Sequence, residues 1–253
     1  MYQFFVDDSQ VSENAVVIES SDVNHIRNVL RMKRGEKVRV STTSGKNYYC
    51  VIAELTERMV RAEILEEYAE GTELDCRIYL FQGLPKSDKM ELIIQKAVEL
   101  GVYEIIPVAM KNCVAKLDEK KAPGRIERWQ EIARSAAKQS KRSLIPAVRM
   151  PMGYEEAVRM AKELDIVLLP YENERGMAAT REAIGTIRPG QNIGVFIGPE
   201  GGFSESEIAL ADKSGMQRIS LGKRILRTET AGLATLAILM YQIESGTDGS
   251  IFG

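Results

Sequence analysis

The chain has 253 residues, of which 44% are hydrophobic and 28% charged, and its formal net charge is −2. These values fit one large or two ordinary globular domains with a real core, and they argue against a generally basic nucleic-acid binder. No apolar run approaches the ~20 residues of a membrane span, and the first ten residues lack the basic region of a secretory signal. The cysteines, Cys50, Cys76 and Cys113, stand singly. This pattern predicts neither a metal site nor a disulfide framework and indicates a reduced, cytoplasmic protein.

Positive charge gathers in three segments of this acidic chain. Residues 25–39 carry six basic residues and one acid, residues 132–149 carry five basic residues and no acid, and residues 218–227 carry four and no acid. A single cluster of this kind is usually a solvated surface. Three of them together favour an anionic partner.

The first 70 residues have the patterning of a small, mostly β domain. Residues 20–35 place apolar side chains at helical spacing and end at Gly35. Residues 36–66 alternate polar and apolar residues around the turn TSGKN. We therefore predict one domain over residues 1–70, followed by a charged linker.

Strands and helices alternate from residue 74 onward. Apolar runs predict strands at 74–82, 103–110, 165–171, 191–198 and 216–222. Amphipathic segments predict helices at 87–101, 122–142, 153–164, 174–185, 204–215 and 228–245. Asp88 and Glu91 are expected to form a capping box for the first of these helices. This alternation is typical of a parallel sheet covered on both faces, so residues 74–253 are predicted to form an α/β domain.

The run GPEGG, residues 198–202, follows the strand at 191–198 and precedes a helix that Ser204 or Ser206 is expected to cap, with Glu207. Glycines allow a ligand to approach the backbone closely. The run lacks the lysine of a P-loop and lies too late for a Rossmann fingerprint. Since Glu200 would repel phosphate, a neutral or cationic ligand suits it better. A plain strand–helix turn is the alternative.

Two other strand ends are also irregular. The strand at 165–171 runs into Pro170, Tyr171 and Glu172, and the last strand is followed by LGKRILR, residues 221–227. Ile225 and Leu226 stand between basic residues there. Apolar side chains on a loop indicate a planar apolar ligand, unless they fill the core beneath the loop.

Several motifs in this sequence resemble those of one known protein family. IGPEGGFSESEI and LGKRILRTETAGLATL closely resemble the RsmE family of ribosomal RNA methyltransferases, which belongs to the SPOUT class. NHIRNVLRMKRGEKV, KSDKMELIIQKAVELGVYEIIPV and QSKRSLIPAV also resemble the family, so the resemblance runs the full length of the chain.

The resemblance implies a fold and a function that patterning does not reach. Residues 74–253 would form a SPOUT α/β domain with a deep trefoil knot in the last third of the chain, which is a rare exception to unthreaded connections. The N-terminal domain would be a PUA-like β-barrel that binds RNA. The protein would be a homodimer with its active sites near the interface, using S-adenosylmethionine and no metal. It would methylate N3 of one uridine in the decoding region of 16S rRNA in the small ribosomal subunit.

The resemblance and the three irregular strand ends together give the expected site residues. The expected cofactor-binding residues are Leu168, Leu169, Pro170, Tyr171, Glu172, Ile197, Gly198, Pro199, Glu200, Gly201, Gly202, Leu221, Gly222, Ile225 and Leu226. The catalytic candidates are Arg227, Glu229 and Glu200. The expected RNA-binding residues are Arg27, Arg31, Lys33, Arg34, Lys86, Gln139, Lys141 and Arg142.

Gln139 and Arg142 match a family signature of an amide and an arginine on one helix face. The chain departs from the family nearby, because Ser135, Lys138 and Lys141 stand where an acid, an acid and a glycine are common. The lone His25 lies in the N-terminal domain, where a structural or RNA-contacting role suits it better than catalysis.

Two other functions remain open at this stage. The chain could be a ribosome-binding or assembly factor that keeps the knot with little activity, although all three loops are intact. It could also be a SPOUT enzyme that modifies tRNA, which the N-terminal segment disfavours.

Overall fold

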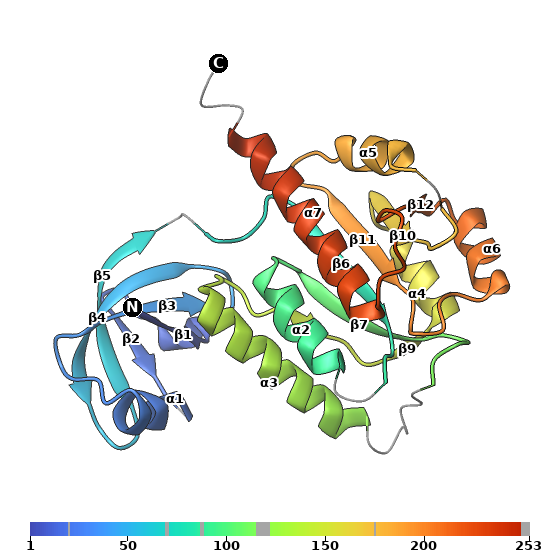
Figure 1. The fold of residues 1–253 in the computed structure, drawn as a ribbon. Helices are drawn as coiled ribbons and strands as arrows, with labels where there is room; N and C mark the ends of the chain where they lie inside the picture. Colours follow the sequence, from blue (N-terminus) through green and yellow to red (C-terminus); the bar gives the residue numbers. More distant parts are fainter. Residues whose placement is uncertain (20, 69–70, 87–88, 115–121, 175, 249–253) are drawn as a thin grey trace. The chain divides into compact units, whose positions relative to one another are not determined.

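The computed structural model describes residues 1–19, 21–68, 71–86, 89–114, 122–174 and 176–248. The chain forms two compact units (Figure 1). The first unit contains residues 1–73 and 137–145, and the second contains residues 74–136 and 146–253. Within the described ranges, we find no helix whose length and apolar character would let it cross a membrane.

The first unit is built on a five-stranded sheet. Its strands are β1 (Tyr2–Val6), β2 (Ala15–Ile18), β3 (Lys37–Thr42), β4 (Asn47–Leu55) and β5 (Val60–Tyr68), and its short helical segments are η1 (Asp8–Gln10), α1 (Ser21–Asn24) and the π-helical turn η2 (His25–Val29). The strand order is β1-β3-β4-β5-β2, with β1 parallel to β3 and the other pairs antiparallel. The edge strands β1 and β2 also contact each other, so the sheet curls around its core. The fully buried side chains of that core include Phe4, Val16, Val38, Cys50 and Val60.

Residues 137–145 join the first unit through charged contacts. Lys138 Nζ lies 2.6 Å from Asp22 Oδ1. Arg142 is only 3% exposed, and its guanidinium is paired with Glu73, to whose carboxylate oxygens its Nε donates at 3.1 and 3.2 Å. The backbone carbonyl of Arg142 accepts a hydrogen bond from Gln3 Nε2. A charge this deeply buried requires such a partner.

The second unit contains the remaining elements. Its strands are β6 (Arg77–Gly83), β7 (Glu104–Ala109), β8 (Ala147–Val148), β9 (Met152–Gly153), β10 (Ile166–Pro170), β11 (Asn192–Ile197) and β12 (Gln217–Ile219). Its helices are α2 (Lys89–Glu99), the greater part of α3 (Ala122–Ser140), α4 (Tyr154–Ala161), α5 (Ala178–Gly185), α6 (Glu205–Lys213) and α7 (Thr228–Asp248).

The second unit is a parallel sheet with helices on both faces (Figure 1). The strand order is β12-β10-β11-β6-β7-β8, and β9 also pairs with β7. Phe81 and Phe196 stack with ring centroids 4.3 Å apart and belong to the core shared with α4 and α6. The next residue of β11, Ile197, points to the opposite face, where α7 packs alongside α2. Alternate residues of one strand therefore serve two cores, which explains the near-continuous apolar runs.

The predicted alternation of strands and helices after residue 74 is confirmed, with element ends shifted by a few residues. No strand was predicted at β1, β2, β8 or β9. The expected capping residue Asp88 lies outside the described residues. The expectation that Gln139 and Arg142 share a helix face is wrong, because α3 ends at Ser140 and Lys141 then takes a left-handed φ of 60°.

Removing the carboxylate of Glu73 should destabilise the first unit. Glu73→Ala removes the carboxylate with which the buried Arg142 guanidinium is paired, which should lower the free energy of unfolding by about 3 kcal/mol. The control is Glu99→Ala, which breaks the more exposed pair with Lys96 and should cost less than about 1 kcal/mol. Urea denaturation followed by circular dichroism measures both. Equal losses would contradict a structural role for the Arg142 pair.

Candidate functional site

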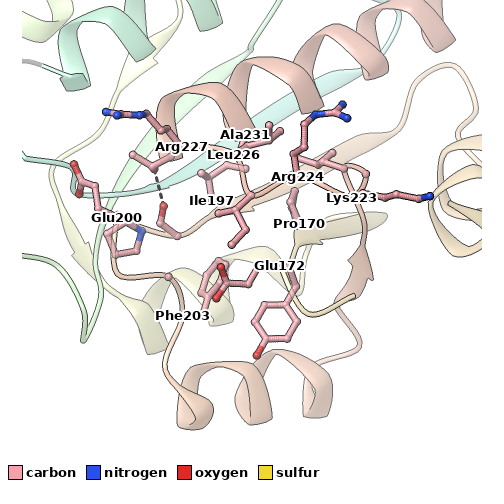
Figure 2. A pocket seen from close by; sticks show the side chains of 18 of the residues that line it. Pro170, Glu172, Ile197, Glu200, Phe203, Lys223, Arg224, Leu226, Arg227 and Ala231 are labelled. Carbon is pink, nitrogen blue, oxygen red and sulfur yellow. Dashed lines mark hydrogen bonds between the residues drawn. The ribbon is translucent and has the colours of Figure 1, made fainter. Parts of the chain in front are cut away.

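Three loops meet at one edge of the parallel sheet of the second unit. β10, β11 and β12 are neighbours in the order β12-β10-β11, so their carboxyl ends lie together. Residues at these ends and in the loops that follow, namely 170–172, 197–200, 202–203 and 221–228, line a cavity of about 380 Å³ (Figure 2). This is the edge at which open α/β sheets hold their ligands.

Most residues expected from the sequence to bind a ligand line this cavity. They are Pro170, Tyr171, Glu172, Ile197, Gly198, Pro199, Glu200, Gly202, Leu221, Gly222, Ile225 and Leu226, together with the catalytic candidate Arg227. Leu168, Leu169, Gly201 and Glu229 are not part of the lining. Leu168 and Leu169 are fully buried in β10. The lining also contains six residues that were not predicted from the sequence, Lys89, Phe203, Lys223, Arg224, Thr228 and Ala231.

Glycines in the loop 198–202, and Gly83 beside it, let the backbones of neighbouring segments pack against each other. A Cβ on Gly83, at the end of β6, would lie 2.7 Å from the Pro199 nitrogen. A Cβ on Gly201 would lie 2.9 Å from the Cβ of Asn112, whose side-chain amide donates to the Gly201 carbonyl at 3.0 Å. Gly201 therefore faces the segment after β7 and not the cavity. Gly202 has a φ of 65°, a conformation that glycine adopts without strain.

A buried chain of hydrogen bonds fixes the first turn of α7 to this loop. The Thr228 hydroxyl donates to the Gly198 carbonyl at 2.6 Å, the bond drawn in Figure 2. It accepts from Gln82 Nε2 at 2.9 Å, and that amide also donates to the Gly83 carbonyl at 3.0 Å. Gln82 is fully buried. The ends of β6 and β11 and the start of α7 are thus joined inside the protein.

The predicted capping box of the helix after the loop is confirmed with Ser204 as its N-cap. The Ser204 backbone N–H donates to Glu207 Oε2 at 2.8 Å. The other carboxylate oxygen of Glu207 accepts from the Lys111 backbone N–H at 2.8 Å. Glu207 consequently ties α6 to the segment after β7.

Glu200 belongs to a cluster of three charges. Lys89 Nζ lies 3.1 Å from Glu200 Oε1 and 3.2 Å from Glu229 Oε2, and the Lys86 backbone N–H donates to Glu200 Oε1 at 3.1 Å. Burial alone would raise the pKa of Glu200, but hydrogen bonds from its own N–H and from Lys86, with the charge of Lys89, lower it overall. The hydrogen bond to Glu200 raises the pKa of Lys89, which remains an ammonium.

The last loop brings cations and one apolar side chain to the rim of the cavity. Lys223, Arg224 and Arg227 are exposed, and Ile225 is 82% exposed. Figure 2 shows Ile197 and Leu226 in the middle of the lining, with Glu200 toward one end and Lys223 and Arg224 toward the other. Ile225 does not fill core beneath the loop, so one alternative from the sequence is excluded for this residue.

The RNA-binding candidates of the first unit differ in exposure. Arg31, Lys33, Arg34, Gln139 and Lys141 are exposed, and Arg27 is half-buried. The exposed His25 begins the π-helical turn η2, a feature common at functional sites.

Arg31 and Lys141 share a left-handed backbone, with φ of 54° and 60°, that glycine adopts far more easily. The left-handed φ of Lys141 fits the glycine that the family resemblance implies at this position. The Arg142 guanidinium is buried and paired with Glu73, so we do not propose it as an RNA contact. In the second unit, Lys86 is exposed.

The chain matches known protein families over both of its units. Residues 72–240 match the RNA methyltransferase domain, and residues 18–65 match the RNA methyltransferase PUA domain. Ribosomal RNA small subunit methyltransferase E of Bacillus subtilis (strain 168) is 36% identical over 230 residues, which are 90% of each chain. The chain belongs to the RsmE family.

Further members of the RsmE family support the same assignment. The enzyme of the same name from Mesomycoplasma hyopneumoniae (strain 232) is 36% identical over 93% of this chain and 97% of its own. The crystal structure of the Neisseria gonorrhoeae member, which is bound to S-adenosyl methionine, is 36% identical. It has a TM-score of 0.81 and covers 94% of this chain and 95% of that chain.

A side chain at Gly201 should disturb the site through Asn112. In Gly201→Ala the new Cβ would lie 2.9 Å from the Cβ of Asn112 and 3.1 Å from its carbonyl oxygen, so the loop must move. We expect a loss of about 1–3 kcal/mol in unfolding free energy, together with weaker ligand binding in the cavity.

Gly124→Ala is the control, because its Cβ meets nothing within 4 Å and lies in α3. Thermal melting and calorimetric titration with S-adenosylmethionine measure the two effects. Unchanged stability and binding in Gly201→Ala would show that the loop does not depend on this contact.

Proposed function

We propose that this protein transfers a methyl group from S-adenosylmethionine to N3 of one uridine in the decoding region of 16S rRNA. Membership of the RsmE family supports rRNA of the small subunit as the substrate. The observation that carries the proposal is the cavity formed by the three strand-end loops, with exposed cations at its rim. Ribosomal RNA as the substrate supports a cytoplasmic location for the reaction.

The cavity fits S-adenosylmethionine. Its volume of about 380 Å³ lies in the range of small-molecule sites. Ile197, Leu221 and Leu226 would pack against the adenine, while the backbone of Gly198 and Gly202 would allow close approach. The ionised Glu200 suits a ligand that carries positive charge. When bound, the cofactor supplies an electrophilic methyl group.

The residues of the chain must make uridine N3 nucleophilic, because N3 carries a proton and reacts only when that proton is lost. A carboxylate can accept the proton, and a cation can stabilise the anion that forms. A lowered pKa makes Glu200 a weak proton acceptor, so we assign charge compensation to Glu200. Glu229, in the first turn of α7, is then the carboxylate candidate that we propose as the general base. Arg227, at the rim, would stabilise the uracil anion or hold a phosphate.

We further propose that residues 1–70 form the RNA-binding domain and residues 74–253 the methyltransferase domain. Phosphate contacts would come from Arg27, Arg31, Lys33 and Arg34, with further contacts from Lys86, Gln139 and Lys141. Such contacts give affinity without base choice. The choice of uridine would come from rRNA shape and from the flipped base in the cavity.

The trefoil knot and the homodimer belong to the same proposal. The hydrogen bond from Thr228 to Gly198 holds the last loop against the loop after β11, and the proposed knot would involve both of these segments. Leu92 on α2 and Tyr241 on α7 are 45% and 72% exposed, and these two helices pack together. Their exposed apolar side chains suit a contact with a second copy.

Methyl transfer tests the proposed activity directly. The protein is incubated with S-adenosylmethionine carrying a labelled methyl group and, separately, with intact small subunits, naked 16S rRNA and tRNA. We expect label on the small subunit or its rRNA, on N3 of a single uridine, located by nuclease digestion and mass spectrometry. Absence of transfer to all three RNAs would leave an assembly factor as the better interpretation, and transfer to tRNA alone would exclude the rRNA assignment.

Glycine substitutions at Arg31 and Lys141 separate the effect of the cation on RNA affinity from the effect of the left-handed backbone on stability. Arg31→Gly and Lys141→Gly remove a cation and relieve the left-handed backbone, so stability should rise by about 1 kcal/mol. Affinity for 16S rRNA should fall, and the slope of log affinity against log salt should decrease in magnitude by about 1. Filter binding at several salt concentrations and thermal melting measure these changes.

The matched controls are Arg31→Ala and Lys141→Ala, which lose the cation and keep the strained backbone. They should lose the same affinity without the gain in stability. Full RNA affinity in the glycine variants would remove Arg31 and Lys141 from the RNA contacts.

A further inference from the structure

Lys89 is a lysine of the cavity to which the family resemblance assigned no role. It lies in the first described turn of α2, and it lines the cavity. Its ammonium lies 3.1 Å from Glu200, in the loop after β11, and 3.2 Å from Glu229, in the first turn of α7. One side chain thus connects three separate elements beside the proposed ligand.

The position is a poor one for a cation in a helix. The amino end of a helix carries partial positive charge and favours acids, so a lysine there is disfavoured unless nearby anions compensate it. Glu200 and Glu229 supply that compensation. The geometry therefore ties this lysine to the two carboxylates and not to the stability of α2.

The two carboxylates depend on Lys89 to different degrees. Glu200 also accepts the Lys86 backbone N–H. In the described part of the chain, Lys89 is the one ion-pair partner of Glu229. The side chains of Glu229 and Glu200 are only 16% and 25% exposed, so little water screens their repulsion if the cation is removed.

We infer that Lys89 is a positioning residue that holds Glu200 and Glu229 beside the cavity and so sets the rate of methyl transfer, not the affinity for the cofactor. This inference rests on the proposed function. Affinity would come from the loop backbones, the apolar lining and Glu200, which keeps its hydrogen bond from the Lys86 backbone N–H when Lys89 is replaced. Rate depends on where the two carboxylates stand relative to the uracil.

Three variants of α2 test this assignment. Lys89→Met removes the charge and keeps the length of the side chain, and Lys89→Arg keeps a cation that can bridge two carboxylates. Lys96→Met is the control, because Lys96 lies on the same helix, pairs with Glu99 at 2.8 Å and does not line the cavity. For each we would measure kcat on small subunits, the Kd for S-adenosylmethionine by calorimetry, and the melting temperature without cofactor.

The inference predicts a split between rate and binding. Lys89→Met should lower kcat by about 100-fold, the size expected for a misplaced catalytic group. Its Kd should stay within about threefold of the unaltered protein, a free-energy difference below about 1 kcal/mol. Lys89→Arg should recover kcat to within about tenfold. Lys96→Met should match the unaltered protein.

Several outcomes would overturn the assignment. These are a kcat for Lys89→Met equal to that of Lys96→Met, a Kd that weakens in step with kcat, or no recovery in Lys89→Arg. If Lys89→Met fails to fold, then Lys89 is structural, provided that Lys89→Arg also melts early. If the unaltered protein methylates no RNA, the proposed function fails instead, and the Kd values still report on Lys89.

A double variant separates positioning from an independent effect. If Lys89 acts by placing Glu229, then Glu229→Gln should cost little more in the Lys89→Met background than Lys89→Met alone. Fully multiplicative losses in kcat would show that the two side chains act separately, which contradicts the inference.

Discussion

Close contact between backbones at the ends of neighbouring parallel strands is the constraint on which the site depends. Gly83 rests on the Gly198–Pro199 peptide, and Gly201 rests on Asn112, at distances that leave no space for a Cβ. These contacts hold the loop after β11 between the segments that follow β6 and β7. Its cavity side is then free for a ligand, since its other side is occupied by the protein itself. The glycines therefore act directly on packing within the protein, and this packing positions the loop that a ligand would contact.

Polar contacts further restrict the position of the loop after β11. The buried chain from Gln82 through Thr228 to Gly198 fixes the first turn of α7 against the loop, and Lys89 joins the same two elements at the edge of the cavity. Each buried hydrogen bond of this chain restricts the geometry, because a shift would leave its donor or acceptor without that partner. Both sets of contacts place the carboxylates of Glu200 and Glu229 with a precision that a flexible loop would lack.

The sequence was informative where local patterning decides the structure. Apolar runs gave the parallel sheet, and loops at three strand ends gave most of the cavity lining. Lys89 was missed, because nothing in a helix start shows which carboxylates lie across from it, although a cation at that position is itself an unusual signal. Arg142 looked like an exposed base, since burial beside Glu73 depends on a contact 69 residues away along the chain. Gly201 was predicted to contact a ligand, but in the structure it faces Asn112.

Residues 137–145 belong to the first unit, although the chain on either side of them belongs to the second. The chain leaves the first unit after residue 73, returns at 137 and leaves again after 145, so no single cut separates the two units. A fragment that starts at residue 74 would carry the Arg142 segment without Glu73, Gln3 or Asp22, its partners. A fragment that stops at residue 73 would expose the surface which that segment covers. Neither half is a natural folding unit, and each would be prone to misfolding or aggregation when made alone.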